Sequence, residues 1–132
     1  RSGEHFAFDL LSIATSASRP NGEPLFDERM VIEPSRFAPE ALGAMGPWSI
    51  LGNCFVLAPE PIVEAIYPKL HSRIDREQEL AVGVTRLPSH CGLSVRVLGN
   101  DTTKVKHTLR QICSVVRSEV KGCSLPAEFP WR

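Results

Sequence analysis

The sequence has no excess of charge of either sign, because 15 Lys and Arg residues balance 15 Asp and Glu residues. Without a net field, the chain is not expected to gather nucleic acid or an anionic membrane surface, and neither is predicted as a partner. It has no apolar run near the roughly 20 residues that a membrane-spanning helix needs. Residues 1–10 also lack the pattern of a secretory signal. We therefore expect a cytoplasmic protein.

Cysteine is also sparse, and its spacing contains no CxxC pair. The four cysteines are Cys54, Cys91, Cys113 and Cys123. This spacing favours neither a disulfide scaffold nor a closed zinc site, and the cysteines are interpreted as ordinary thiols. What the chain does have is the composition of a folded domain, with 42% hydrophobic and 23% charged residues in a length of 132 that suffices for one core.

Alternation of apolar and polar residues predicts two strands near the start, at 5–14 and 25–32. Asn21-Gly22 between them is a strong hairpin signal. On the second strand, Glu28 interrupts an otherwise apolar face, whereas Asp27 belongs to the opposite face. A carboxylate on a buried face needs a partner or internal water.

A connector rich in proline and glycine is predicted at 34–47. The segment 48–58 that follows is apolar on both alternating sets, which predicts a strand covered on both faces and central in its sheet. A helix is expected from Pro61, with a stripe of isoleucine and leucine every fourth residue as far as Ile74 and a break at Pro68.

Two further strands are predicted at 80–87 and 93–98, joined by a short loop. A last helix should begin at a cap on Asn100 or Asp101 and end at Gly122. Its buried stripe consists of Val105, Leu109, Ile112 and Val116. The order of elements indicates a strand-rich α+β chain, mainly antiparallel, with two helices in its C-terminal half.

The residues alone leave several chemistries open. The adjacent His90 and Cys91 suggest a thiol nucleophile and base, as in a small Cys/His-dependent hydrolase. His71 and His107 are expected on solvated helix faces, where they favour no closed metal site. The basic helix from Lys104 to Lys121 suggests binding of RNA or an acidic partner, but few aromatic residues accompany its charges to stack bases. A generic α+β interaction module therefore stands beside the hydrolase as an alternative.

Several short segments, taken in order, carry a resemblance to a known family. They are Gly-Glu-His-Phe at 3–6, Gly-Glu-Pro-Leu-Phe-Asp-Glu-Arg at 22–29, Thr-Arg-Leu-Pro at 85–88, Gly-Leu-Ser-Val-Arg-Val-Leu-Gly-Asn-Asp at 92–101, and the stretch from Pro126 to Trp131. Together they resemble the C-terminal part of the urease accessory protein UreD (UreH) family, over residues 1–132. Because family members are about twice as long, the resemblance implies that their N-terminal half is absent here.

The resemblance implies a maturation chaperone with stacked sheets and no enzymatic activity. Such a protein binds apo-urease and UreF, which recruits the GTPase UreG, and a water-filled passage is thought to conduct nickel to urease. A conducting passage needs weak, exchangeable oxygen ligands, so nickel would be transient and no cofactor tightly bound. Glu4, Asp27 and Glu28 are the candidate lining residues. The alternative for them is an ion pair with Arg29 that satisfies the sheet.

Overall fold

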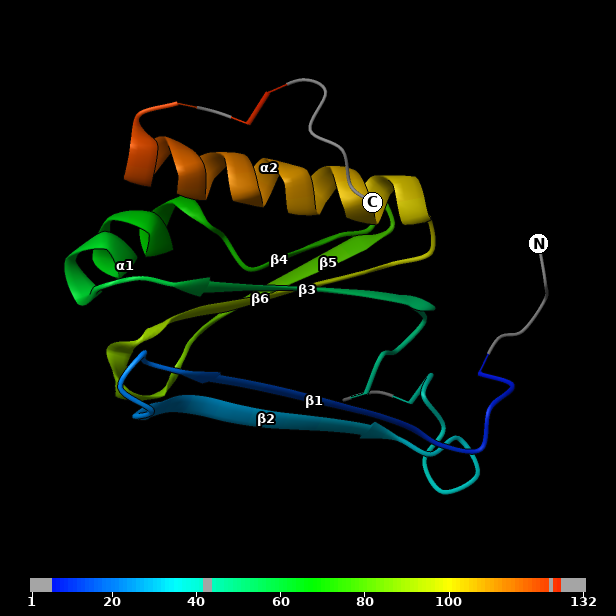
Figure 1. The fold of residues 1–132 in the computed structure, drawn as a ribbon. Coiled ribbons are helices and arrows are strands. Elements are labelled where there is room, and N and C mark those ends of the chain that lie inside the picture. The colour runs from blue at the N-terminus through cyan, green and yellow to red at the C-terminus, as the bar shows by residue number, and fades with distance from the viewer. Residues whose placement is uncertain (1–5, 42–43, 124, 127–132) are drawn as a thin grey trace. The chain divides into compact units, whose positions relative to one another are not determined.

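The computed structural model describes residues 6–41, 44–123 and 125–126, and its two compact units divide the chain between Ser49 and Ile50. Within these residues there are six strands in two antiparallel sheets and two α-helices, both helices in the second unit. Figure 1 labels these elements. The predicted strand-rich α+β class is confirmed.

The first unit contains a hairpin of β1 (Leu11–Ser18) and β2 (Pro24–Ile32). Its turn is closed by hydrogen bonds from Arg19 N to Glu23 O (2.8 Å) and from Gly22 N to Arg19 O (2.9 Å). The predicted hairpin is therefore confirmed. The first strand begins later than predicted, because among the described residues its pairing with β2 starts at Leu11, opposite Ile32, where β2 ends.

Turns and bends occupy the described part of the predicted connector at 34–47. Local backbone hydrogen bonds hold them, such as Arg36 N to Glu33 O (2.9 Å) and Met45 N to Pro39 O (2.9 Å). The boundary between the two units follows directly after this segment.

The second unit is a four-stranded antiparallel sheet in the order β3-β6-β5-β4. Its strands are β3 (Ile50–Leu57), β4 (Arg73–Asp75), β5 (Leu80–Arg86) and β6 (Gly92–Gly99). Helix α2 (Thr102–Lys121) lies along one face of this sheet, with the short helix α1 (Glu60–Ile66) beside it (Figure 1). Single 3₁₀ turns at Tyr67–Lys69 and Pro88–His90 complete the described elements.

The prediction that the segment 48–58 forms a central strand is wrong. In the described sheet β3 is an edge strand that pairs only with β6, and β6 is central. Apolar residues on both sides of a strand show that its faces are covered, but they say nothing about how many of its edges are hydrogen-bonded. Accordingly Leu93, Val95 and Val97 of β6 are completely buried, whereas β3 is mostly half-buried.

The first predicted helix is shorter than its apolar stripe. Helix α1 ends at Ile66, and Pro68 lies in the 3₁₀ turn that follows, because proline has no N–H to continue the helical ladder. Leu70 is still buried, but Ile74 belongs to β4 and its side chain is 72% exposed. The four-residue spacing predicted Ile74 to be part of the core, and this prediction is wrong.

Helix α2 matches its sequence prediction. Asp101 caps it by accepting hydrogen bonds from Thr103 N (2.7 Å) and Lys104 N (3.2 Å), and Gly122 ends it with φ of 67°. Val105 and Ile112 are buried in the core against the sheet, with the other two stripe residues packed against that core. Gly52 favours the close approach of the helix, since a Cβ there would lie 2.7 Å from Leu109 Cδ1.

Candidate functional site

The acidic residues predicted from the sequence do not form one cluster in the described structure. Asp27 and Glu28 are consecutive in β2, so their side chains point to opposite faces of the hairpin. Asp27 is exposed, whereas Glu28 is half-buried on the face that also carries Phe26 and Met30. Glu4 lies outside the described residues.

Metal-ligating side chains are dispersed in the described part of the chain. Among those residues, no group of three or more His, Cys, Asp or Glu side chains is close enough together to hold a metal ion. A carboxylate among the described residues that bound a metal ion would therefore share it with water or with ligands outside these residues.

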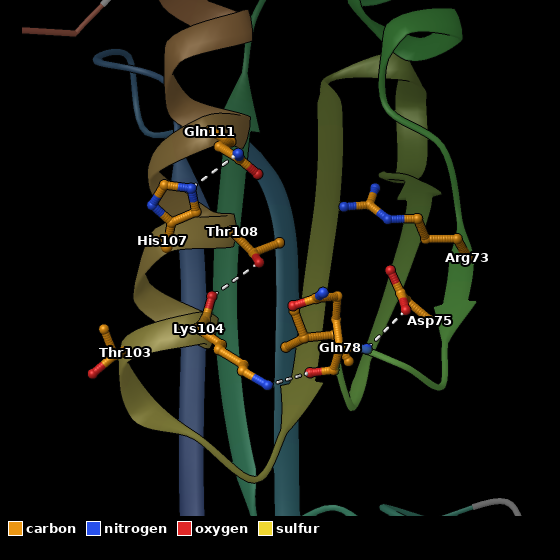
Figure 2. A pocket seen from close by; sticks show the side chains of 9 residues that line it. Arg73, Asp75, Gln78, Thr103, Lys104, His107, Thr108 and Gln111 are labelled. Carbon is orange, nitrogen blue, oxygen red and sulfur yellow. Dashed lines mark hydrogen bonds between the residues drawn. The ribbon is translucent and has the colours of Figure 1, made fainter.

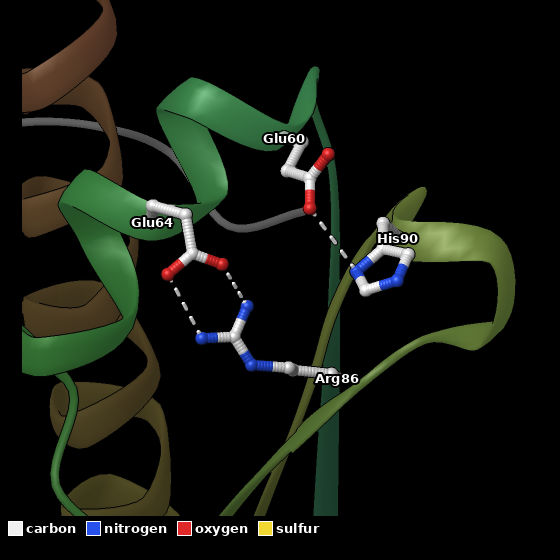
Figure 3. Close-up of polar contacts among 4 residues, drawn as sticks. All are labelled: Glu60, Glu64, Arg86 and His90. Atoms are coloured by element: carbon white, nitrogen blue, oxygen red, sulfur yellow. Dashed lines mark hydrogen bonds and ion pairs between the residues drawn. The ribbon is translucent and has the colours of Figure 1, made fainter.

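The adjacent His90 and Cys91 face different surroundings. His90 is exposed, and its Nδ1 lies 3.4 Å from Glu60 Oε1 at the start of α1 (Figure 3). Cys91 is buried at the end of the same loop. Both Ser89 and His90 have positive φ, which turns the chain sharply there. The contact that orients the imidazole ring is thus with a carboxylate of the neighbouring helix.

A second charged contact lies beside it, between α1 and the end of β5. Arg86 donates from both terminal nitrogens to the two carboxylate oxygens of Glu64, one of these bonds being 3.1 Å long (Figure 3). The guanidinium also lies 4.3 Å from the centre of the Tyr67 ring. The hydrogen bonds from Arg86 lower the pKa of the Glu64 carboxyl, and those to Glu64 raise the pKa of Arg86. Sequence spacing gave no signal for this contact, because its partners are 22 residues apart.

A cavity of about 440 Å³, lined mainly by polar residues, opens between α2 and the β4–β5 hairpin (Figure 2). Its walls come from the first three turns of the helix, from β4 and from the turn that follows β4. The lining residues are Arg73, Asp75, Gln78, Leu80, Thr103, Lys104, His107, Thr108 and Gln111.

Hydrogen bonds around this cavity hold several of its side chains, and one of them crosses from α2 to the turn after β4. Lys104 Nζ donates to Gln78 O (3.2 Å), and Asp75 Oδ1 accepts from Gln78 N (2.9 Å). His107 Nε2 and Gln111 Nε2 are 3.0 Å apart, and Arg73 extends into the same space (Figure 2). With two permanent cations against one carboxylate, the cavity suits a carboxylate or another small anion better than a metal cation. His107 was predicted on a solvated face and is indeed exposed.

A pair of thiols joins β3 to α2 inside the second unit. Cys54 Sγ and Cys113 Sγ are 4.0 Å apart, although the residues are 59 positions apart in the chain. Both side chains are half-buried and neither is in a disulfide. The hydrogen bond between them lowers the pKa of Cys113 to about 7 and, together with burial, raises the pKa of Cys54. The cysteines are free thiols, as predicted, but their spacing in the sequence gave no signal that Cys54 and Cys113 lie side by side.

These features define a strand-rich α+β protein whose polar clusters lie around α1, α2 and the ends of the sheet. The family of UreD urease accessory proteins matches it over residues 1–132. The chain is 37% identical over 127 residues to the urease accessory protein UreD of Photorhabdus laumondii, covering 96% of this chain and 40% of that protein. It is 36% identical to UreD 2 of Brucella suis, covering 98% of this chain and 43% of that protein. It is also 36% identical to UreD of Yersinia enterocolitica, covering 98% of this chain and 42% of that protein.

The chain belongs to the UreD urease accessory protein family. This confirms the resemblance that its short segments indicated. The chain spans about two-fifths of the length of the curated relatives it matches. Among the described residues, no helix combines the length and the apolar character needed to cross a bilayer.

Proposed function

We propose that this chain takes part in urease maturation as a non-catalytic scaffold in the cytoplasm. In this role it binds apo-urease and UreF, through which the GTPase UreG is recruited, and it helps to deliver nickel to the urease active site. The observation that supports the proposal is the match to the UreD family along the whole chain, with 36–37% identity to three urease accessory proteins.

Nickel is cargo in this proposal and is not a resident cofactor. Ions move only along ligands that release them, so single carboxylates and water suit the task better than a closed set of ligands. Because β2 sends Asp27 and Glu28 to opposite faces, a route along the half-buried face would be lined by Glu28. Asp27 would line only a route along the exposed face. Glu4, near the start of the chain, is still proposed as a lining residue of the nickel passage.

A chimera tests the scaffold proposal directly. The portion of the Photorhabdus laumondii protein that matches this chain is replaced by residues 1–132, and the chimera is expressed with a urease gene cluster that lacks its own UreD. Urease activity and nickel content should return, and a tag on the chimera should retain UreF and apo-urease. If a chimera that melts cooperatively restores none of these, the scaffold proposal is wrong.

Two substitutions in the same chimera separate the nickel route from simple folding. Glu28→Gln keeps the size of the side chain and removes its negative charge, so nickel content and urease activation should fall while UreF and apo-urease are still retained. Asp27→Asn is the matched control on the exposed face of the same strand and should leave activation unchanged. Unchanged activation in Glu28→Gln rules out its role in conduction, and loss of the complex favours the ion-pair alternative. Glu4→Gln applies the same test to the third candidate lining residue.

A further inference from the structure

The contact between Cys54 and Cys113 follows from how α2 lies on the sheet. Gly52 and Cys54 are two positions apart in β3 and therefore point to the same face, the one against which Leu109 packs. Cys113 follows Leu109 by four residues, which places it one helical turn further on the same side of α2. Two residues of strand advance about 6.6 Å and four residues of helix about 6 Å, so the two steps match.

The two sulfur atoms are close enough to bond after a small movement. Their separation of 4.0 Å must fall to about 2.05 Å in a disulfide. Side-chain rotation at either cysteine supplies part of this approach. The rest is available from β3, which is an edge strand in the described sheet and is hydrogen-bonded there to β6 alone. Helix α2 already packs against β3, closely enough that a Cβ at residue 52 would lie 2.7 Å from Leu109 Cδ1.

The chemistry of the pair favours reaction at one sulfur first. Either sulfur can donate in the hydrogen bond between Cys54 and Cys113. When Cys54 is the donor, the bond stabilises the thiolate of Cys113 and lowers its pKa. A thiolate is the nucleophile in thiol–disulfide exchange, and a neighbouring thiol then resolves the mixed disulfide. Both residues are half-buried, which leaves part of each exposed.

We propose that Cys54 and Cys113 form a reversible redox site that reacts with low-molecular-weight disulfides such as glutathione disulfide. The Cys113 thiolate attacks one sulfur of glutathione disulfide, whose S–S bond breaks and releases one glutathione thiolate. Cys54 then gives up its proton and attacks Cys113 Sγ, which releases the second glutathione thiolate. The two protein thiols are oxidised to one disulfide, one glutathione disulfide is reduced to two thiols, and the protons pass to the released glutathione.

The bond would tether α2 to β3 across the core of the second unit. It closes a loop that includes α1, β4, β5 and β6, so the oxidised form should resist unfolding more than the reduced form does. Both partners lie within one compact unit. The proposal therefore concerns a covalent state of the chain that is independent of its role in urease maturation.

Peptide mapping of the full chain tests the proposal. The protein is incubated with glutathione disulfide at neutral pH, quenched with an alkylating agent and digested without reduction. We expect two fewer alkylated cysteines than in the reduced protein, a linked pair of peptides containing Cys54 and Cys113, and a higher urea midpoint that dithiothreitol reverses. The wild-type map decides the question without any variant.

Three variants identify the thiols that take part. Cys54→Ser should stop at a mixed disulfide of Cys113 with glutathione, and Cys113→Ser should prevent the internal bond. Cys123→Ser, which alters an exposed cysteine, is the matched control and should still give the linked peptides. The proposal is overturned if Cys54 and Cys113 remain free or are linked to other cysteines in the wild-type map, whether or not Cys123 carries glutathione.

Discussion

Replacing Gly52 by alanine tests the close packing of α2 on β3. Gly52 has ordinary strand backbone, so alanine is compatible with its conformation. The added Cβ, however, would lie 2.7 Å from Leu109 Cδ1 and 3.0 Å from Val105 Cγ1. Carbon atoms in contact prefer about 3.5–4.0 Å, so the leucine side chain or the helix has to move by about 1 Å.

The expected cost follows from two opposing effects. Overpacking of this kind costs about 1–3 kcal/mol, and the smaller entropy of the unfolded alanine chain returns about 0.4–1 kcal/mol. We therefore expect Gly52→Ala to lower the free energy of unfolding by about 1–2 kcal/mol. Leu109→Ala should cost about 2 kcal/mol, near the lower end for leucine, because Leu109 is only half-buried.

The double variant isolates the contact itself. Once Leu109 is truncated, the new methyl group at residue 52 occupies space that the leucine has vacated. The double variant should then be destabilised by about 1 kcal/mol less than the sum of the two single variants. Gly83→Ala is the matched control, because Gly83 lies in β5 of the same sheet and a Cβ there would have nothing within 4 Å. It should leave stability unchanged or slightly raised.

Urea unfolding followed by far-UV circular dichroism provides the measurement, since both described α-helices belong to the second unit. The midpoints of the four variants are compared at an unchanged slope. Strict additivity of Gly52→Ala and Leu109→Ala, or an equal effect of Gly83→Ala, would refute the argument that α2 contacts β3 at Gly52.

Further outcomes are expected at Asp101, at Gly92 and at the Cys54–Cys113 pair. Asp101→Ala removes the cap of α2 and should lower stability by about 0.5–2 kcal/mol, so an unchanged urea midpoint would contradict the capping role. Gly92 has a φ of 157°, and a Cβ added there would lie 2.0 Å from Val56 O. Gly92→Ala should therefore lower stability more than Gly52→Ala does, and an equal or higher melting temperature would contradict this. Alkylation of Cys113 should accelerate as pH rises through about 7, as its thiol becomes thiolate. Cys54→Ala removes the hydrogen bond that stabilises this thiolate and should move the midpoint to higher pH, and an unmoved midpoint would contradict the coupling of the two thiols.

The sequence predicted well where a structure depends on neighbours along the chain. The hairpin at Asn21-Gly22, the helix stop near Pro68 and the cap of α2 at Asp101 are all governed by residues within a few positions. The stripe of α2 was predictable because residues three and four apart share one face of a helix. Ordered short segments also indicated the UreD family before any fold was known.

The sequence could place Asp27 and Glu28 on opposite faces of a strand, because the alternation of side chains is a local property. It could not place the cavity between α2 and the β4–β5 hairpin. Arg73 and Lys104 are both visible as cations in the sequence, but only the packing of the helix on the sheet brings them to one opening. The Arg86–Glu64 contact is hidden for the same reason.

Local sequence thus determined the turns, the caps, the apolar faces and the family of this protein, since each depends on short-range spacing or on the order of segments. Tertiary structure alone decided that β3 is the edge and β6 the centre of the described sheet. It also decided that Cys54 meets Cys113. The physical reason is that strand order and helix docking depend on contacts between residues far apart in the chain, and the local pattern of apolar residues is compatible with more than one such arrangement.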